Sequence, residues 1–173
     1  TSGGMLRTLA LFEQLATQYE VTVISPDGVL IARRDGSRRS QPPAATTGGA
    51  RGRLEQAATF ERYRSISGVR IGGTALLANL RRGASGHYDV GIVDHTCLAG
   101  LADGLATGCD QVLVSMHNIE SDLMDQRAKA ATSPATGVPM AMETRLLRRL
   151  EAEVAAKYPL VLTTQADADA LPG

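Results

Sequence analysis

The sequence predicts an α/β fold with a doubly wound, mainly parallel sheet. Short runs of β-branched residues alternate with longer segments in which apolar residues recur at three- and four-residue steps. The first pattern is typical of strands, and the second is typical of helices that bury one face. Strands separated by helices imply parallel pairing through right-handed crossovers. The length of 173 residues suits one domain with a full core, so we expect residues 1–173 to form a single domain.

Each predicted element rests on its own local pattern. The clearest strands are Val21–Ser25, Tyr88–Asp94, Gln111–Met116 and Leu160–Thr163. Helical spacing covers residues 4–19, 54–64, 74–82, 97–106, 119–131 and 142–154, and another helix begins at 166–171. Pro134 and Gly137 interrupt the helical pattern over residues 132–138. Asn118 is placed to cap the helix that follows it, and Arg149 and Glu153 are spaced for an i,i+4 contact.

Residues 29–53 carry glycine, proline, serine and threonine together with six arginines and almost no acidic partner. We expect a long mobile loop. One interpretation is a basic flap over an anionic acceptor or a lipid surface, and the simpler one is a solvated loop.

The composition excludes several classes of function. Eighteen basic residues balance 18 acidic ones, and only 3% of residues are aromatic, which disfavours nucleic acid as a partner. Cys97 and Cys109 lack zinc-site spacing and are expected to be buried thiols in a reducing compartment. No metal site, membrane-spanning run or export signal is predicted. The sequence also lacks the nucleophile elbow, the phosphate-binding loop and the dinucleotide fingerprint.

Two of the three histidines directly follow predicted strands, and this places both at one edge of a parallel sheet. His95 follows Asp94, and His117 precedes Asn118 and Glu120. Ligands bind at the carboxyl edge of open α/β sheets, and an imidazole can exchange a proton near neutrality. The alternative for each histidine is a structural role in satisfying nearby backbone groups.

Gly3 and Gly4 stand at the start of the first predicted helix. Glycine permits close approach of the backbone to a ligand, and a helix N-terminus offers N–H groups to a phosphate. The alternative is an ordinary turn.

In order along the chain, five segments resemble the amino-terminal domain of GT-B glycosyltransferases of the retaining family four. They are Ser2-Gly3-Gly4-Met5-Leu6-Arg7, Glu20-Val21-Thr22-Val23-Ile24, Tyr88-Asp89-Val90 through Asp94-His95, His117-Asn118-Ile119-Glu120-Ser121, and Asp167-Ala168-Asp169-Ala170-Leu171. The resemblance implies a Rossmann-like domain on the acceptor side of a cleft. It also implies transfer of a sugar from a nucleotide-diphosphate-sugar donor to an acceptor, with retention of configuration.

The resemblance assigns roles to the same residues. Gly3 and Gly4 would approach the diphosphate and sugar of the donor, and His117 would lie beside the sugar as the catalytic-site residue. The acceptor side would be formed by His95, Asp94, Asn118, Glu120 and Arg7. The family generally needs no metal and no cofactor besides the nucleotide-sugar co-substrate, so catalysis would come from positioning and from stabilising the departing diphosphate.

The chain departs from the family pattern at both ends. The family's first strand and its second, donor-binding domain have no counterpart in these 173 residues. We therefore expect this fragment to be inactive alone and of low stability, because the missing strand is central in that topology. The intact parent is expected in the cytoplasm or at the inner membrane face, with peripheral membrane contact and a glycan, lipid-linked or small-molecule acceptor. The alternatives are a nucleotide-sugar epimerase of the same architecture and a non-catalytic α/β ligand-binding or regulatory domain.

Overall fold

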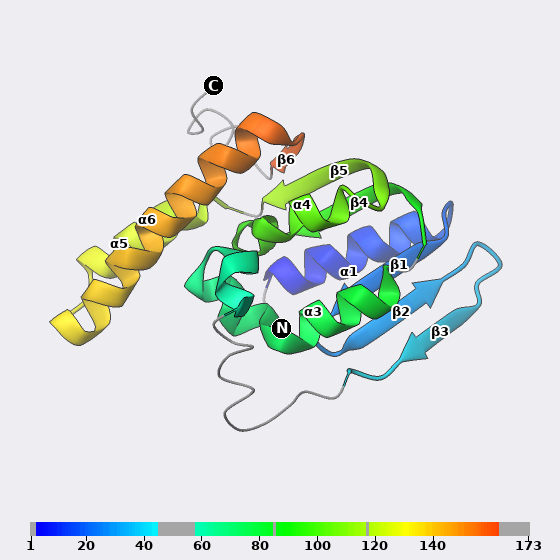
Figure 1. The fold of residues 1–173 in the computed structure, drawn as a ribbon, viewed down its shortest axis with the longest axis horizontal. Coiled ribbons are helices and arrows are strands. Elements are labelled where there is room, and N and C mark those ends of the chain that lie inside the picture. Colours follow the sequence, from blue (N-terminus) through cyan, green and yellow to red (C-terminus); the bar gives the residue numbers. More distant parts are fainter. Residues whose placement is uncertain (1–2, 45–57, 85, 117, 163–173) are drawn as a thin grey trace. The chain divides into compact units, whose positions relative to one another are not determined.

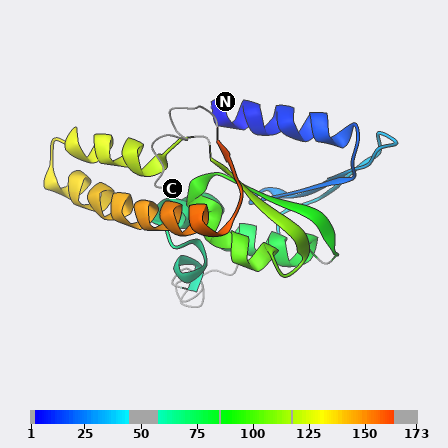
Figure 2. The same ribbon diagram turned by 90° about the horizontal axis from the view of Figure 1, so that it is seen from above.

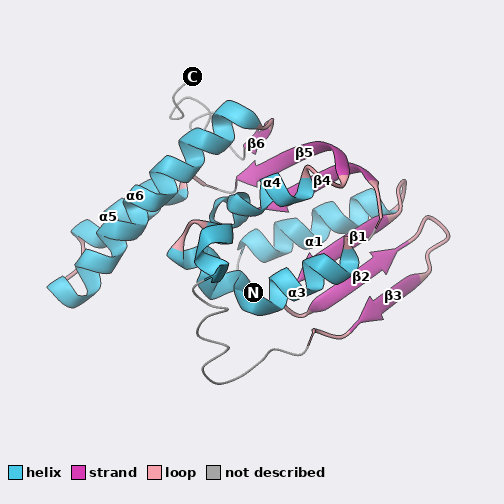
Figure 3. Ribbon diagram, in the orientation of Figure 1, coloured by secondary structure: helices cyan, strands magenta, loops and turns pink. Residues whose placement is uncertain are grey.

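The computed structural model describes residues 3–44, 58–84, 86–116 and 118–162, and it divides into two compact units. Unit 1 comprises Thr1–Gln56 and Ile71–Gly86, and unit 2 comprises Ala57–Arg70 and His87–Gly173. Each unit contains helices and one three-stranded sheet (Figures 1 and 3). The fold is therefore mixed α/β, as the sequence predicts.

The sheet of unit 1 is an antiparallel meander in the order β1-β2-β3. The elements of this part of the chain are α1 (Gly3–Ala16), β1 (Val21–Ser25), β2 (Gly28–Ala32) and β3 (Arg38–Gln41). β1 and β2 form a hairpin in which Ser25 pairs with Gly28 across the two residues Pro26 and Asp27. Gly28 has φ 140°, and a Cβ atom there would lie 2.2 Å from the carbonyl oxygen of Gln41, so only glycine fits.

Asn79 holds the hairpin turn of unit 1. It lies on α3 (Ile66–Gly83), a helix kinked at Gly73 that belongs to unit 1 from Ile71 onward. Its side chain is fully buried, and its amide donates to the carbonyl oxygens of Ser25 at 2.8 Å and Pro26 at 3.2 Å. Its side-chain oxygen accepts the backbone N–H of Ala44 at 2.9 Å. One buried side chain thus satisfies backbone groups from the β1–β2 turn and from the segment after β3, which would otherwise be costly to bury.

The sheet of unit 2 is parallel, in the order β4-β5-β6. Its elements are β4 (Tyr88–Asp94), η1 (Thr96–Leu101), α4 (Ala102–Leu105), β5 (Cys109–Met116), α5 (Glu120–Lys129), α6 (Pro134–Lys157) and β6 (Leu160–Leu162). Residues on one face of β4 and β5 pack with η1, α4 and α6 to form the buried core. The central members of this core are Val93, Val112, Val114, Met116, Leu150 and Val154.

Helices α5 and α6 lie side by side as an antiparallel pair (Figure 2). The sequence predicts a break over residues 132–138, but α6 already begins at Pro134. The reason is that proline is well suited to the first turn of a helix, where its missing N–H has no intrahelical partner. Pro139 lies further inside the helix, where its nitrogen cannot donate to the preceding turn. The predicted contact between Arg149 and Glu153 is present at 2.9 Å.

The predicted doubly wound sheet is not confirmed. In the described part of the chain the strands form two three-stranded sheets, and β1 pairs antiparallel with β2. The prediction of a long loop is wrong in part. The predicted loop over residues 29–53 contains β2 and β3 in its first part, while residues 45–53 lie outside the described residues. The arginine-rich composition concealed β3 because its residues are mostly exposed, so no apolar alternation marks the strand. The single-domain interpretation stays a prediction.

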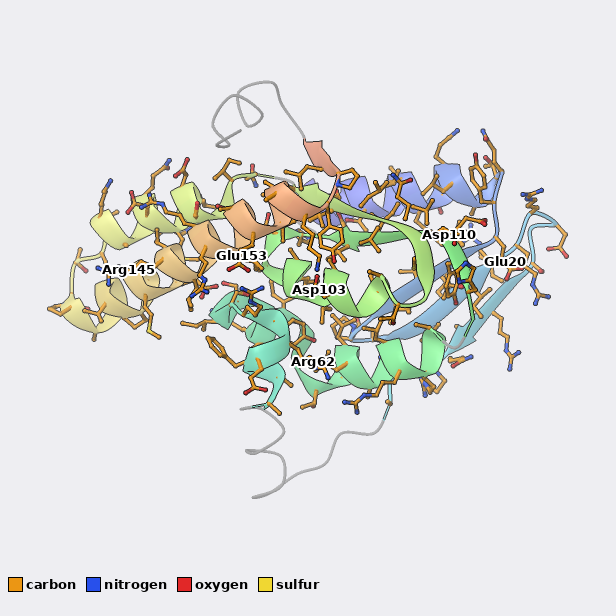
Figure 4. All side chains as sticks on the ribbon, turned by 45° about the horizontal axis from the view of Figure 1, so that its top comes forward. Glu20, Arg62, Asp103, Asp110, Arg145 and Glu153 are labelled. Carbon is orange, nitrogen blue, oxygen red and sulfur yellow. The ribbon has the colours of Figure 1, made fainter. Side chains whose placement is uncertain are left out.

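Among the described residues, no helix combines the length and apolar character that crossing a membrane requires. α6 is the longest helix, and charged residues occur along it; two of them, Arg145 and Glu153, are labelled in Figure 4.

The bonding of Asn79 generates a stability prediction. Replacing Asn79 by Asp removes the amide donor and directs a carboxylate at two carbonyl oxygens. We expect the free energy of unfolding to fall by about 2–4 kcal/mol at pH 7. The loss should shrink near pH 4, because the protonated form of the new carboxyl group can donate to one carbonyl oxygen. Urea unfolding at both pH values measures this effect.

The matched control is Asn118→Asp, which makes the same chemical change at an exposed position. We expect its unfolding free energy to stay within about 0.5 kcal/mol of the wild-type value. Equal effects of the two substitutions would contradict the role of Asn79.

Candidate functional site

The carboxyl edge of the parallel sheet in unit 2 carries the best candidate site among the described residues. Asp94 ends β4 and pairs with Ser115 of β5, and His95 follows directly. Glu120 begins α5, four residues after β5 ends. The two strand ends therefore place an imidazole and a carboxylate at the edge where α/β sheets bind ligands.

The backbone of His95 adopts a conformation that is rare for any residue other than glycine. Its φ is 88° and its ψ is 130°. Two hydrogen bonds hold this conformation: the His95 N–H donates to the carbonyl oxygen of Ser115 at 3.0 Å, and the His95 carbonyl accepts the N–H of Leu98 at 3.1 Å. Such a conformation costs roughly 1–3 kcal/mol, and strained residues concentrate at functional sites.

The strained backbone brings the His95 ring to Glu120. The distance from Nδ1 of His95 to Oε1 of Glu120 is 3.7 Å, within ion-pair range. The Glu120 side chain is 19% exposed and the His95 side chain 36% exposed. Both side chains can therefore be reached from solvent.

Cys97 lies beneath this pair on η1 and is buried. Burial raises the pKa of its thiol, and the negative charges of Glu120 and Glu143 raise it further. A thiol with a raised pKa is a weak nucleophile because little thiolate forms at neutral pH. The arrangement therefore does not support nucleophilic catalysis by Cys97, and this residue has a packing role beneath the pair.

A buried carboxylate on α6 fixes where α5 begins. Glu151 is 3% exposed, and its Oε1 accepts the backbone N–H of Ser121 at 3.1 Å. Burial raises the pKa of Glu151, the hydrogen bonds from Ser121 oppose this rise, and the charges of Glu120 and Asp122 add to it. Glu151 therefore holds the helix turn that carries Glu120 without itself reaching solvent.

A second buried carboxylate on the same helix anchors α3. The carboxylate oxygens of Glu143 accept the backbone N–H groups of Ile66 at 2.7 Å and Ser67 at 2.8 Å. The Ser65 hydroxyl donates to the carbonyl oxygen of Cys97 at 2.8 Å and accepts the N–H of Gly68. These bonds tie the first turn of α3 to α6 and to η1, the segment that follows His95.

Two buried hydroxyl groups near the strand ends have no hydrogen-bond partner within the described chain. They are Oγ1 of Thr96 and Oγ of Ser115, and both residues are 1% exposed. Each adjoins the backbone turn at His95, either in sequence or through its hydrogen bond. An unpaired buried hydroxyl group costs free energy, so the turn at His95 carries a second unfavourable contribution besides its backbone strain.

The structure tests the placement of the predicted site residues only in part. It brings His95 and Glu120 together, as the shared sheet edge predicts. Asp94 is half-buried at the end of β4, whereas Asn118 is exposed. The predicted cap by Asn118 is wrong, because Ile119 occupies the cap position, no side chain caps the helix there, and Glu151 bonds to its first turn instead.

The remaining predicted residues lie elsewhere. His117, the predicted catalytic-site residue, lies outside the described residues. Gly3 and Gly4 are the first two residues of α1 in unit 1, which agrees with the predicted helix start, and Arg7 belongs to the same helix.

Sequence reasoning missed Glu143 and Glu151, although a signal was present. Both lie at helical spacing from Leu147, one turn before it and one turn after it, on the apolar stripe that also contains Leu150 and Val154. A glutamate within an apolar stripe indicates a buried carboxylate that needs donors.

The arrangement can bind a hydroxylated ligand. Glu120 offers an acceptor for a hydroxyl proton, and the ring of His95 can donate or accept a hydrogen bond. No group of three or more metal-binding side chains occurs in the part of the chain that the structure covers.

The chain matches no protein-family model, no curated protein and no solved structure.

The strain at His95 generates a prediction about stability. Glycine should relieve it, whereas alanine should not. We expect His95→Gly to unfold with a free energy about 1 kcal/mol higher than that of His95→Ala, after the extra chain entropy of glycine is included. Asp94 in the regular strand supplies the control: Asp94→Gly should be less stable than Asp94→Ala. Thermal and urea unfolding of the four variants measure these differences. If alanine were more stable than glycine at both positions, strain at His95 would be excluded.

Two glutamates on α6 should affect the pH dependence of stability in opposite directions. The pKa of Glu151 is raised by burial, so the wild-type protein loses stability as pH rises from the unfolded pKa through the folded one. Glu151→Gln keeps an acceptor for Ser121 and should remove that loss. The pKa of Glu153 is lowered by Arg149 and Arg64, so its contribution is present above the unfolded pKa and is lost as pH falls.

Urea unfolding of both variants between about pH 3 and pH 8 measures these slopes. Glu151→Gln should become more stable relative to wild type as pH rises, and Glu153→Gln should become less stable. Parallel curves for the two variants would contradict the assignment.

Proposed function

We propose that this chain is the acceptor-side domain of a retaining glycosyltransferase that uses a nucleotide-diphosphate-sugar donor. The observation that supports it most directly is the pair of His95 and Glu120, held by a strained backbone at the carboxyl edge of a parallel sheet. The sequence resemblance assigns both residues to the acceptor side, and their chemistry suits recognition of an acceptor hydroxyl group.

In this proposal each residue has a separate role. Glu120 accepts a hydrogen bond from the acceptor hydroxyl group, and His95 orients the same oxygen. His117 lies beside the transferred sugar, and Gly3 and Gly4 approach the donor diphosphate at the start of α1. Catalysis then depends on positioning the hydroxyl oxygen and on stabilising the departing diphosphate. The proposed acceptor is a glycan, a lipid-linked group or a small molecule, and the proposed location is the cytoplasm or the inner membrane face.

The test uses the full-length protein that contains this chain. Release of nucleoside diphosphate is measured with uridine and guanosine diphosphate sugars in the presence of monosaccharide, polyol and lipid-linked acceptors. Glu120→Gln and His95→Ala should lower kcat/KM for the acceptor by about 10-fold or more, because each removes or weakens a hydrogen bond to the acceptor hydroxyl group. The KM for the donor should stay unchanged.

Asp122→Asn is the matched control for Glu120→Gln. Both substitutions neutralise a carboxylate in the first turn of α5, but the Asp122 side chain is 56% exposed and pairs with Arg148. This control should keep wild-type activity. Equal rates for wild type and Glu120→Gln would remove the proposed role, and no diphosphate release with any donor would contradict the transferase.

Two other outcomes identify the alternative functions. Epimerised free sugar formed without an acceptor would favour a nucleotide-sugar epimerase of the same architecture. Saturable sugar binding without turnover would favour a non-catalytic ligand-binding domain.

A further inference from the structure

The hairpin of α5 and α6 has an uneven distribution of charge. Its two helices lie side by side, and the turn that joins them points away from the sheet of unit 2 (Figures 1 and 2). Residues 126–149, here called the basic segment, include the end of α5, the turn and most of α6. The basic segment contains five cationic residues, all exposed, and one acidic residue, Glu143, which is buried. The exposed charge of the basic segment is therefore entirely positive.

Two of the five cations have a charge that no carboxylate neutralises. Arg127 on α5 and Arg145 on α6 are exposed, and neither forms an ion pair with any residue that the structure describes (Arg145 is labelled in Figure 4). A guanidinium group can donate two parallel hydrogen bonds to one phosphate group, so both arginines are available to an external anion. The other three cations contact carboxylates outside the basic segment, in the pairs Lys129 with Asp125, Arg148 with Asp122 and Asp125, and Arg149 with Glu153.

Two large apolar side chains share an exposed face of α6 with Arg145. Val138 is 67% exposed and Met142 is 55% exposed. Val138, Met142 and Arg145 follow one another at steps of four and three residues, so they lie on one face of the helix. The buried residues Leu147 and Leu150 occupy a different face. The exposed face of α6 therefore presents apolar side chains next to a free cation.

We propose that this face of α6 binds the surface of a membrane that contains anionic phospholipids. Val138 and Met142 insert at the level of the lipid headgroups, and Arg145 donates to the phosphate groups beside them. Charge complementarity supports this partner, because the basic segment has no exposed carboxylate that an anionic surface would repel. The proposal extends the proposed location at the inner membrane face. Its test uses no sugar donor, so its failure would leave the proposed transferase activity untouched.

A bilayer suits this face better than a protein partner does. Among the described residues of α6, only Val138 and Met142 combine a large apolar side chain with an exposed position. A stable protein interface buries about 800 Å² on each partner around a packed apolar centre, which two protruding side chains do not supply. The headgroup region of a bilayer is fluid and accepts protruding side chains without a matching pocket, and neighbouring cations add affinity for anionic lipids.

The first experiment measures vesicle binding by the full-length protein that contains this chain, without sugar donor or acceptor. Co-sedimentation with vesicles of phosphatidylcholine alone is compared with vesicles that contain about one third phosphatidylglycerol. The wild-type protein should bind the anionic vesicles at least ~10-fold more tightly than the neutral ones. Salt at about 0.5 M should remove most of this preference, because it screens the charges. Equal binding to both kinds of vesicle would contradict the proposal.

Substitutions on the exposed face of α6 test which residues make the contact. Arg145→Glu should weaken binding to the anionic vesicles at least ~10-fold, because it replaces an attraction by a repulsion, whereas Arg145→Lys should keep most of the binding. Met142→Gln should weaken binding about 3-fold or more, because its amide group enters the membrane interface less readily. Arg39→Glu is the matched control for Arg145→Glu, since Arg39 is an exposed arginine on β3, and it should bind as the wild type does. Circular dichroism checks that all variants fold.

Hydrogen exchange locates the contact on the wild-type protein. Anionic vesicles should slow amide exchange in peptides that span residues 134–145 and leave exchange in β3 unchanged. Two further results would overturn the proposal. One is wild-type binding by both Arg145→Glu and Met142→Gln, and the other is weaker binding by Arg39→Glu alone, which would assign the lipid contact to the arginine-rich segment 29–53. Binding to soluble polyglutamate but to no vesicle would also overturn it and would assign the face to an acidic protein.

Discussion

Unit 2 depends on two carboxylates buried on one helix. Glu143 and Glu151 lie on the core-facing side of α6, and each accepts backbone N–H groups from the first turn of another helix. A buried carboxylate is stable only when donors surround it, and the first N–H groups of a helix need acceptors. The buried carboxylates and the first N–H groups of the helices satisfy each other, so hydrogen bonds from α6 fix where α3 and α5 begin. Glu120 stands in the first turn of α5, and its position therefore follows from a contact that never reaches solvent.

The candidate site combines this rigid support with local strain. His95 has a backbone conformation that favours glycine, yet it carries an imidazole beside Glu120. Hydrogen bonds to Ser115 and Leu98 maintain the conformation, while the hydroxyl groups of Thr96 and Ser115 stay unpaired among the described residues. Backbone strain and unpaired hydroxyl groups thus occur together at one turn, whereas the strands that precede it are regular. That distribution is typical of sites in which position matters more than stability.

Local pattern predicted individual elements well and their pairing poorly. The bounds of β1 and β4 agree with the predicted strands, since β-branched residues bounded by turn residues mark a strand wherever it lies. The antiparallel partner of β1 was missed because the short apolar run of β2 was assigned to the arginine-rich segment that follows it, in which β3 shows no apolar alternation. The meeting of His95 and Glu120 was predictable from strand ends, since parallel strands share a carboxyl edge. Glu151 was missed although it lies in an apolar stripe, and its donor could not be predicted because it comes from a residue 30 positions away.

The sequence by itself determined the alternation of strands and helices, the polar residues at the ends of β4 and β5, and the exposed pair on α6 formed by Arg149 and Glu153. All of these follow from spacing along a single element, so they need no knowledge of distant residues. The tertiary structure alone decided that β1 joins an antiparallel sheet and which backbone N–H groups Glu143 and Glu151 accept. These features depend on hydrogen bonds between segments far apart in sequence, where several partners are chemically equivalent and only packing selects among them.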